Sequence, residues 1–193
     1  MESPMHTVAP EIFRAYDIRG IVGLDLTPAS AERIARGVAG MARDAGHDEI
    51  VVGRDSRLSS PELAAALIAG LRAGGLDVID LGPVTTPMTY FAAEHLGTRA
   101  AVMVTGSHNP PEYNGLKIVL AGESLSAAAL QSLRARIESG DFPSGAGDSR
   151  SHDIFPAYLA RIARDILLLR PLKVVLDAGN GIAGPYAPAL FSA

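Results

Sequence analysis

The chain has 193 residues, 48% hydrophobic and 20% charged, and these values exclude a mainly disordered protein. Seventeen lysines and arginines against 21 aspartates and glutamates give a net charge of −4, which argues against nucleic-acid or membrane partners but allows local pockets for small anions. The absence of cysteine excludes disulfides, thiolate metal sites and a cysteine nucleophile. The sequence shows no secretory signal and no bilayer-spanning apolar run, so we expect a soluble, cytoplasmic α/β protein.

Helical periodicity alternates with short apolar runs along the chain, a pattern typical of repeating βα units. Thr27 and Pro28 begin the first helix as its N-cap and first residue, and Gly46 ends it. The elements predicted next are strand 49–53, helix 60–73, strand 76–81, helix 87–95, strand 99–104, strand 116–120 and helix 126–138. These strands are almost uniformly apolar, which predicts an α/β fold with a mixed, mostly parallel sheet and helices on both faces.

A small, polar, glycine-rich stretch then interrupts the pattern at residues 139–149, which is typical of a linker. We therefore expect a first domain at 1–140, a linker at 141–151 and the beginning of a second α/β domain at 152–193. The predicted elements of the second unit are helix 153–169, strand 173–176, a glycine turn and a new helix after Gly184. Because the sequence stops nine residues after Gly184, we interpret it as a fragment.

The segment from Thr105 to Ile118 carries the strongest functional signal. Ser107 follows a glycine at the carboxyl end of a predicted buried strand, where open α/β sheets bind their ligands. His108, Asn109 and Lys117 add hydrogen-bond donors and positive charge, which suits phosphoryl transfer because that chemistry depends on positioning and charge stabilisation. A polar turn between two strands, with His108 bound to a backbone group, remains the alternative.

Acyl transfer by Ser107 is a weaker hypothesis. A hydrolase nucleophile elbow needs glycine two residues after the serine, and Asn109 stands there. On an extended chain the neighbouring His108 side chain would also point away from Ser107.

Two other segments place charged groups near predicted strands. In segment 13–20, Arg19 could hold a phosphate and Tyr16 could donate a hydrogen bond, although an edge strand with solvated charges is the simpler interpretation. In segment 53–57, the charges of Arg54, Asp55 and Arg57 face the expected ligand side, where an internal arginine–aspartate pair is the alternative to a substrate contact.

A glycine-rich run, Gly179 to Gly184, has the spacing Gly-x-Gly-x-x-Gly after a predicted strand. This spacing occurs in dinucleotide-binding proteins, so a nucleotide-dependent oxidoreductase is a third hypothesis. A tight turn that needs positive φ angles is the favoured interpretation.

Four segments together, at 13–20, 52–57, 105–118 and 175–184, resemble the α-D-phosphohexomutase superfamily, and within it the bacterial phosphomannomutase/phosphoglucomutase group. The resemblance covers essentially the whole chain and corresponds to the N-terminal portion of the family. It implies a four-domain cytoplasmic enzyme, monomeric, whose only partners are phosphosugars. The implied reaction interconverts hexose 1-phosphate and hexose 6-phosphate, with mannose or glucose as the sugar, through a hexose 1,6-bisphosphate.

The resemblance also assigns residues. Ser107 matches the catalytic serine that carries the phosphate, with His108 and Lys117 beside the transferring group. Tyr16, Arg19 and Asn109 match substrate-binding positions of the family.

Magnesium follows from the resemblance as well. The family holds Mg²⁺ with an Asp-x-Asp-x-Asp loop and an oxygen of the serine phosphate, and this sequence contains no such loop. Ser107, through its phosphate, is therefore the only metal ligand that we expect here, and we expect the chain alone to be inactive. A truncated, non-catalytic domain acting as a binding or regulatory module is the alternative function.

Overall fold

The centre of the molecule is a seven-stranded sheet, seen in a computed structural model that describes residues 8–193. Its strand order is β1-β5-β4-β2-β3-β7, with β6 beside β5. The strands are β1 (Ile18–Ile21), β2 (Glu49–Arg54), β3 (Asp77–Pro83), β4 (Ala101–Val104), β5 (Tyr113–Leu120), β6 (Glu123–Ser124) and β7 (Ser149–Ser151). The helices are η1 (Pro10–Ile12), α1 (Pro28–Asp44), α2 (Ser60–Ala73), α3 (Thr86–His95), α4 (Ala127–Ser139), α5 (Phe155–Asp165) and α6 (Ala187–Ser192).

The sheet is mixed. Strands β4, β2, β3 and β7 run parallel to their neighbours in that part of the sheet, whereas β5 is antiparallel to β4, β1 and β6. The predicted α/β class with a mixed sheet is thereby confirmed. Strand β5 begins at Tyr113, three residues before the predicted strand, because β1 pairs with its first half.

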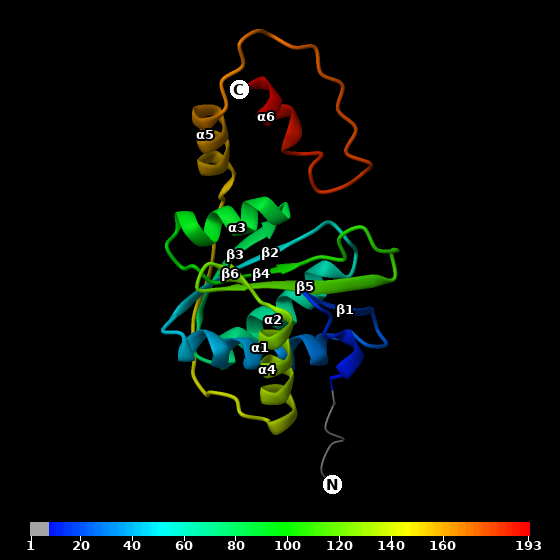
Figure 1. Cartoon of the computed structure of the whole chain (residues 1–193), viewed down its shortest axis with the longest axis vertical. Helices are drawn as coiled ribbons and strands as arrows, with labels where there is room; N and C mark the ends of the chain where they lie inside the picture. The colour runs from blue at the N-terminus through cyan, green and yellow to red at the C-terminus, as the bar shows by residue number, and fades with distance from the viewer. Residues whose placement is uncertain (1–7) are drawn as a thin grey trace.

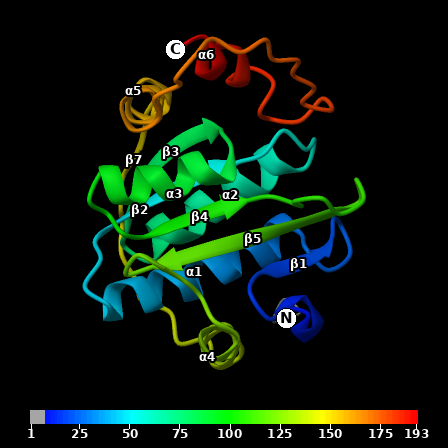
Figure 2. The ribbon, with the colours of Figure 1, turned by 45° about the horizontal axis from the view of Figure 1, so that its top comes forward.

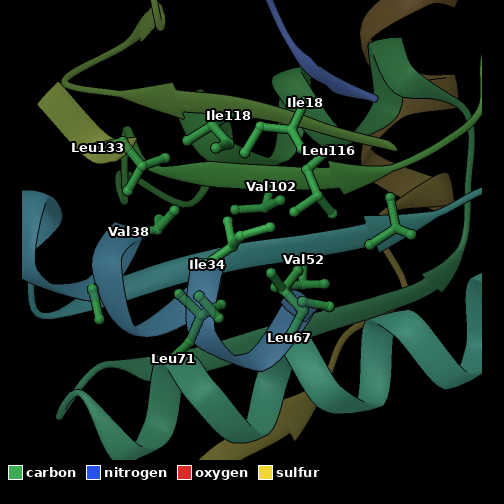
Figure 3. Packing of buried hydrophobic residues seen from close by; sticks show 14 of the residues in the cluster. Ile18, Ile34, Val38, Val52, Leu67, Leu71, Val102, Leu116, Ile118 and Leu133 are labelled. Atoms are coloured by element: carbon green, nitrogen blue, oxygen red, sulfur yellow. The ribbon is translucent and has the colours of Figure 1, made fainter. Parts of the chain in front are cut away.

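Helices cover both faces of the sheet (Figures 1 and 2). Val52 and Val102 point to the face where Ile34 of α1, Leu67 of α2 and Leu133 of α4 are buried (Figure 3). Val51 points to the opposite face, where α3 packs. Each such side chain contributes about 1.5–3 kcal/mol when buried, so the two cores stabilise the packing of the helices on both faces of the sheet.

The helix ends follow local chemistry. Thr27 is the N-cap of α1 as predicted, and it forms a capping box with Ser30: Thr27 accepts a hydrogen bond from the Ser30 amide, and the Ser30 hydroxyl accepts one from the Thr27 amide. Gly46 has a φ of 81°, which ends the helix where a side chain would be strained. None of the helices within residues 8–193 is long and apolar enough to cross a membrane.

The second unit differs from the prediction in its strand. Residues 173–176 form no strand, and Val175 is 90% exposed. Three consecutive apolar residues predicted a buried strand, but no strand in residues 8–193 pairs with this segment, so no ladder forms. Helix α5 also ends at Asp165, four residues before the predicted end, because Ile166 is extended.

The segment expected to be a linker contains a strand. Residues Ser149–Ser151 form β7, which pairs in parallel with β3 at the edge of the main sheet. The sequence did not predict this strand, because it is short and polar and has no apolar run. The domain boundaries at 140 and 151 stay a prediction.

The second unit packs on the α3 side of the sheet (Figure 2). The rings of Phe91 on α3 and Tyr158 on α5 meet edge to face, with centroids 5.3 Å apart. The ring of Phe155 lies 4.9 Å from that of Tyr186, whose hydroxyl donates to the carbonyl of Pro83 at the end of β3. These contacts fix the segments around α5 and α6 against the first unit.

Candidate active site

The loop after β4 holds Ser107 in an uncommon backbone conformation. Its φ is 54°, in the left-handed region that few residues other than glycine adopt. The Ser107 amide donates to Thr105 Oγ1 at 2.9 Å, and the Asn109 amide donates to the Gly106 carbonyl at 3.1 Å. This tight turn leaves the Ser107 side chain exposed at the carboxyl end of the sheet.

The turn places the side chains of His108 and Ser107 close together. Ser107 Oγ and His108 Nδ1 are 3.2 Å apart, within hydrogen-bond distance. The prediction that His108 points away from Ser107 is therefore wrong. It assumed an extended chain, whereas the left-handed backbone of Ser107 places two neighbouring side chains on the same side.

Arg57 binds the loop through four backbone carbonyls. Its guanidinium donates to the carbonyl oxygens of Ser107 at 3.1 Å, Asn109 at 2.6 Å, Pro110 at 2.7 Å and Tyr113 at 2.9 Å. The rigid, fork-shaped guanidinium presents five donors, so one side chain can hold several turns of the backbone. Arg57 thus fixes both ends of the segment that carries Ser107.

Asp55 holds the other side of the same loop. Its carboxylate accepts hydrogen bonds from Thr105 Oγ1 at 2.8 Å and from the Gly106 amide at 3.1 Å, and it lies 3.5 Å from the Arg57 guanidinium. The internal arginine–aspartate pair considered for this segment is present. A methyl group at Gly106 would lie 2.4 Å from Arg57 Cζ, so the close approach of arginine to the loop requires glycine there.

Parallel strands explain why these residues meet. Strands β2 and β4 are neighbours, with Arg54 opposite Val104, so the loops that follow them leave the same edge of the sheet. Asp55 and Arg57 come from the first loop and Ser107 from the second. The sequence predicts both loops on the ligand side, but no signal in it reveals that Arg57 binds the serine loop.

Lys117 and Arg19 share one counter-ion. Lys117 Nζ lies 3.4 Å from the Asp17 carboxylate, which also accepts a hydrogen bond from the Arg19 guanidinium. Lys117 is on β5 and Arg19 on the adjacent β1. Asp17 was not predicted as a site residue, although it lies between Tyr16 and Arg19 in the segment singled out from the sequence.

The remaining predicted residues are placed differently. Tyr16 is 78% exposed, and the Asn109 carboxamide donates to the Gly106 carbonyl at 3.0 Å within the loop itself. Within residues 8–193, no hydrogen bond or ion pair joins Tyr16, Arg19 or Lys117 to Ser107. The structure therefore joins Ser107 directly with His108, and through the backbone with Arg57 and Asp55.

A cleft of about 470 Å³ opens beside Ser107. Its lining includes Asp55, Arg57, Ser107 and Asn109 from the loops after β2 and β4, and residues 179–182 from the second unit. The predicted positive φ angles are present there, with 54° at Gly179 and 62° at Asn180. No strand precedes this turn at 173–176, so the arrangement lacks the strand that a dinucleotide fingerprint requires.

The described residues do not make a complete metal site. In residues 8–193, no group of three or more histidines, aspartates or glutamates lies close enough to hold a metal ion. Mg²⁺ prefers carboxylate and phosphate oxygens, and Asp55, the acidic residue of the cleft, is occupied by Thr105, Gly106 and Arg57. The described residues alone therefore do not fit the cation.

Comparison with known proteins agrees with the fold. Residues 10–144 match the family model of phosphoglucomutase/phosphomannomutase, alpha/beta/alpha domain I. A phosphomannomutase/phosphoglucomutase of Pseudomonas aeruginosa is 50% identical over 187 residues, which are 97% of this chain and 40% of that protein. A phosphoglucomutase of Neisseria gonorrhoeae is 44% identical over 189 residues, 97% of this chain and 41% of that protein.

A solved structure shows the same fold. The crystal structure of a phosphoglucomutase/phosphomannomutase family protein from Burkholderia thailandensis superimposes with a TM-score of 0.91 at 47% identity, covering 96% of this chain and 42% of that one. This chain therefore spans about 40% of the length of the curated relatives that it matches. From the family model, the relatives and the shared structure, the chain belongs to the phosphoglucomutase/phosphomannomutase family.

Proposed function

We propose that the protein interconverts hexose 1-phosphate and hexose 6-phosphate, with glucose or mannose as the sugar, and that Ser107 carries the phosphoryl group. One observation supports this most directly: an exposed serine in a left-handed turn, held by Asp55 and Arg57 at a cleft. A fixed hydroxyl suits phosphoryl transfer, because that reaction depends on the position of the two oxygens between which phosphorus moves. The names of the matched relatives indicate the same sugars.

The backbone of the loop favours a phosphate. The carbonyl oxygens of Ser107, Asn109 and Pro110 accept hydrogen bonds from the Arg57 guanidinium, so their partial negative charges face a cation. In a trans peptide the next N–H group points opposite to the carbonyl, so the His108 amide points away from Arg57. This amide has no hydrogen-bond partner within residues 8–193, which leaves a donor for an oxygen of a phosphate on Ser107.

The proposed transfer moves one phosphoryl group between two oxygens. The bond from phosphorus to Ser107 Oγ breaks while a bond to a sugar hydroxyl oxygen forms, and the proton of that hydroxyl passes to solvent water while Ser107 Oγ takes up another. His108, 3.2 Å from Ser107 Oγ, is the group placed to return a proton to the serine. Lys117, whose charge Asp17 balances, supplies positive charge to the transferring group once substrate is bound. This first transfer yields hexose 1,6-bisphosphate, and the phosphoryl group at its other end then returns to Ser107, which releases the isomeric hexose monophosphate.

Tyr16, Arg19 and Asn109 are proposed to bind the sugar phosphate. Other points stay predictions of the family resemblance. They are the requirement for Mg²⁺, the absence of turnover by these 193 residues alone, a monomeric protein, phosphosugars as the only partners and a cytoplasmic location. No feature of the described residues favours a purely regulatory module over this function.

The test is phosphate transfer to Ser107. The purified full-length protein is incubated with glucose 1,6-bisphosphate, and intact mass and peptide mapping locate the phosphate. One added phosphate on Ser107, absent in Ser107→Ala, supports the proposal. A phosphate on Ser56, Ser59 or Thr105 that persists in Ser107→Ala would contradict the assignment.

A further inference from the structure

We propose that Asn180 is a second binding residue for the phosphorylated sugar, on the wall of the cleft opposite Ser107. This inference rests on the proposed function and adds a contact from the second unit of the chain. The cleft has the usual size of a small-ligand site, at about 470 Å³, and the loop 179–182 lines it together with Ser107 and Asn109.

The loop presents the Asn180 carboxamide as a free donor. The amide of Gly179 donates to the Asp177 carboxylate at 2.8 Å, and the amide of Gly181 donates to the Ala178 carbonyl at 2.8 Å, so the backbone on either side is fixed. The side chain of Asn180 itself makes no hydrogen bond to any part of the chain between residues 8 and 193. A carboxamide has two N–H donors and one acceptor oxygen, which match phosphoryl oxygens and sugar hydroxyls.

The charges of the cleft explain why a neutral amide suits this position. Asp55 and Arg57 are the charged residues of the lining, and they already pair with each other at 3.5 Å. A dianionic sugar phosphate would be repelled by a carboxylate on the opposite wall but not by an amide. Asn180 can therefore orient the ligand without opposing the phosphate.

The wall is held in place by contacts away from the cleft. Tyr186, six residues after Asn180, donates its hydroxyl hydrogen to the Pro83 carbonyl, and its ring contacts Phe155. Because Pro83 ends β3 and Ser107 follows β4, both walls are attached to the carboxyl edge of one sheet. Loop 179–182 is thus positioned by the same framework as the serine.

The experiment uses the ¹⁵N-labelled chain with Ser107→Ala, which prevents transfer, and titrates it with glucose 1-phosphate. Asn180→Gly removes the carboxamide and tolerates the φ of 62°. Asn180→Asp keeps the shape but adds a negative charge. Lys173→Ala, at an exposed position of the same segment outside the cleft lining, is the matched control.

We expect the Asn180 side-chain amide signal to shift on titration, and the Kd for glucose 1-phosphate to rise about tenfold in Asn180→Gly. Asn180→Asp should bind more weakly still, whereas Lys173→Ala should bind as the parent does. If Asn180→Gly does not fold, Asn180→Asp decides the question alone. An unchanged Kd in the folded Asn180 variants, with shifts elsewhere in the cleft, would overturn this inference and leave the proposed function standing. No binding of glucose 1-phosphate by the parent, with no phosphate on Ser107 in the transfer assay, would overturn both.

Discussion

Replacement of Arg57 tests whether the serine loop depends on one side chain. Arg57→Met keeps the apolar stem and removes the guanidinium with its four carbonyl contacts. Two of these hydrogen bonds, to Tyr113 and Asn109, are partly buried, and two are exposed. A hydrogen bond to a charged group contributes about 1.5–3 kcal/mol, and we assign the lower value to the two partly buried bonds and little to the exposed ones. The expected loss in unfolding free energy is therefore about 3 kcal/mol.

The assay is urea unfolding at 25 °C, combined with the rate of Ser107 phosphorylation by glucose 1,6-bisphosphate. A loss of about 3 kcal/mol corresponds to a Tm lower by roughly 6–12 °C in a chain of this size. Arg72→Met is the control, because the Arg72 guanidinium donates to a single carbonyl, that of Gly147, at 2.8 Å. If Arg57→Met lost no more stability than Arg72→Met and phosphorylated Ser107 at the parental rate, the role given to Arg57 would be refuted.

Three further substitutions probe the framework around the site. Gly53→Ala should lower the unfolding free energy by about 1–3 kcal/mol in urea titrations, because the new methyl group would lie 2.4 Å from the hydroxyl of buried Thr89. Asn114→Ala should cost about 2 kcal/mol in the same assay, because this fully buried carboxamide donates to the hydroxyls of Ser59 and Ser60. Burial raises the pKa of the Tyr186 phenol. The neutral phenol therefore contributes its full stabilisation of the folded protein below the ordinary tyrosine pKa of about 10. This contribution is lost as the pH rises through the higher pKa of the folded state. Unfolding midpoints measured across this alkaline range should therefore fall more steeply in the parent than in Tyr186→Phe, and equal slopes would contradict the assignment.

The first unit was predictable because its signals are local and agree with one another. Thr27, Pro28 and Gly46 mark the ends of α1 by the hydrogen bonds and φ angles that they allow, and the apolar runs of β2, β3 and β4 need burial on both faces. The place of Ser107 after a buried strand was also predictable from strand direction. The contacts that hold it were not, because Arg57 and Ser107 are fifty residues apart in the sequence.

Two errors have a common physical origin. The strand at 173–176 was inferred from its apolar run and the orientation of His108 from an extended backbone, and both inferences left out the tertiary contacts that determine the backbone. A strand forms only where a neighbour accepts its hydrogen bonds, and residues 8–193 place none beside 173–176. The turn at Ser107 depends on Asp55 and Arg57, so its left-handed φ could not be inferred from the residues that immediately flank it.

The positive φ of Ser107 also restricts which amino acid can serve as the hydroxyl carrier. Threonine has the same functional group, but its β-branched side chain crowds the backbone in the left-handed region, where even unbranched residues lose about 1–2 kcal/mol. The substitution Ser107→Thr would therefore relax the turn and move the hydroxyl away from His108. The geometry of the loop, rather than the chemistry of the oxygen, makes serine the one alcohol suited to this position.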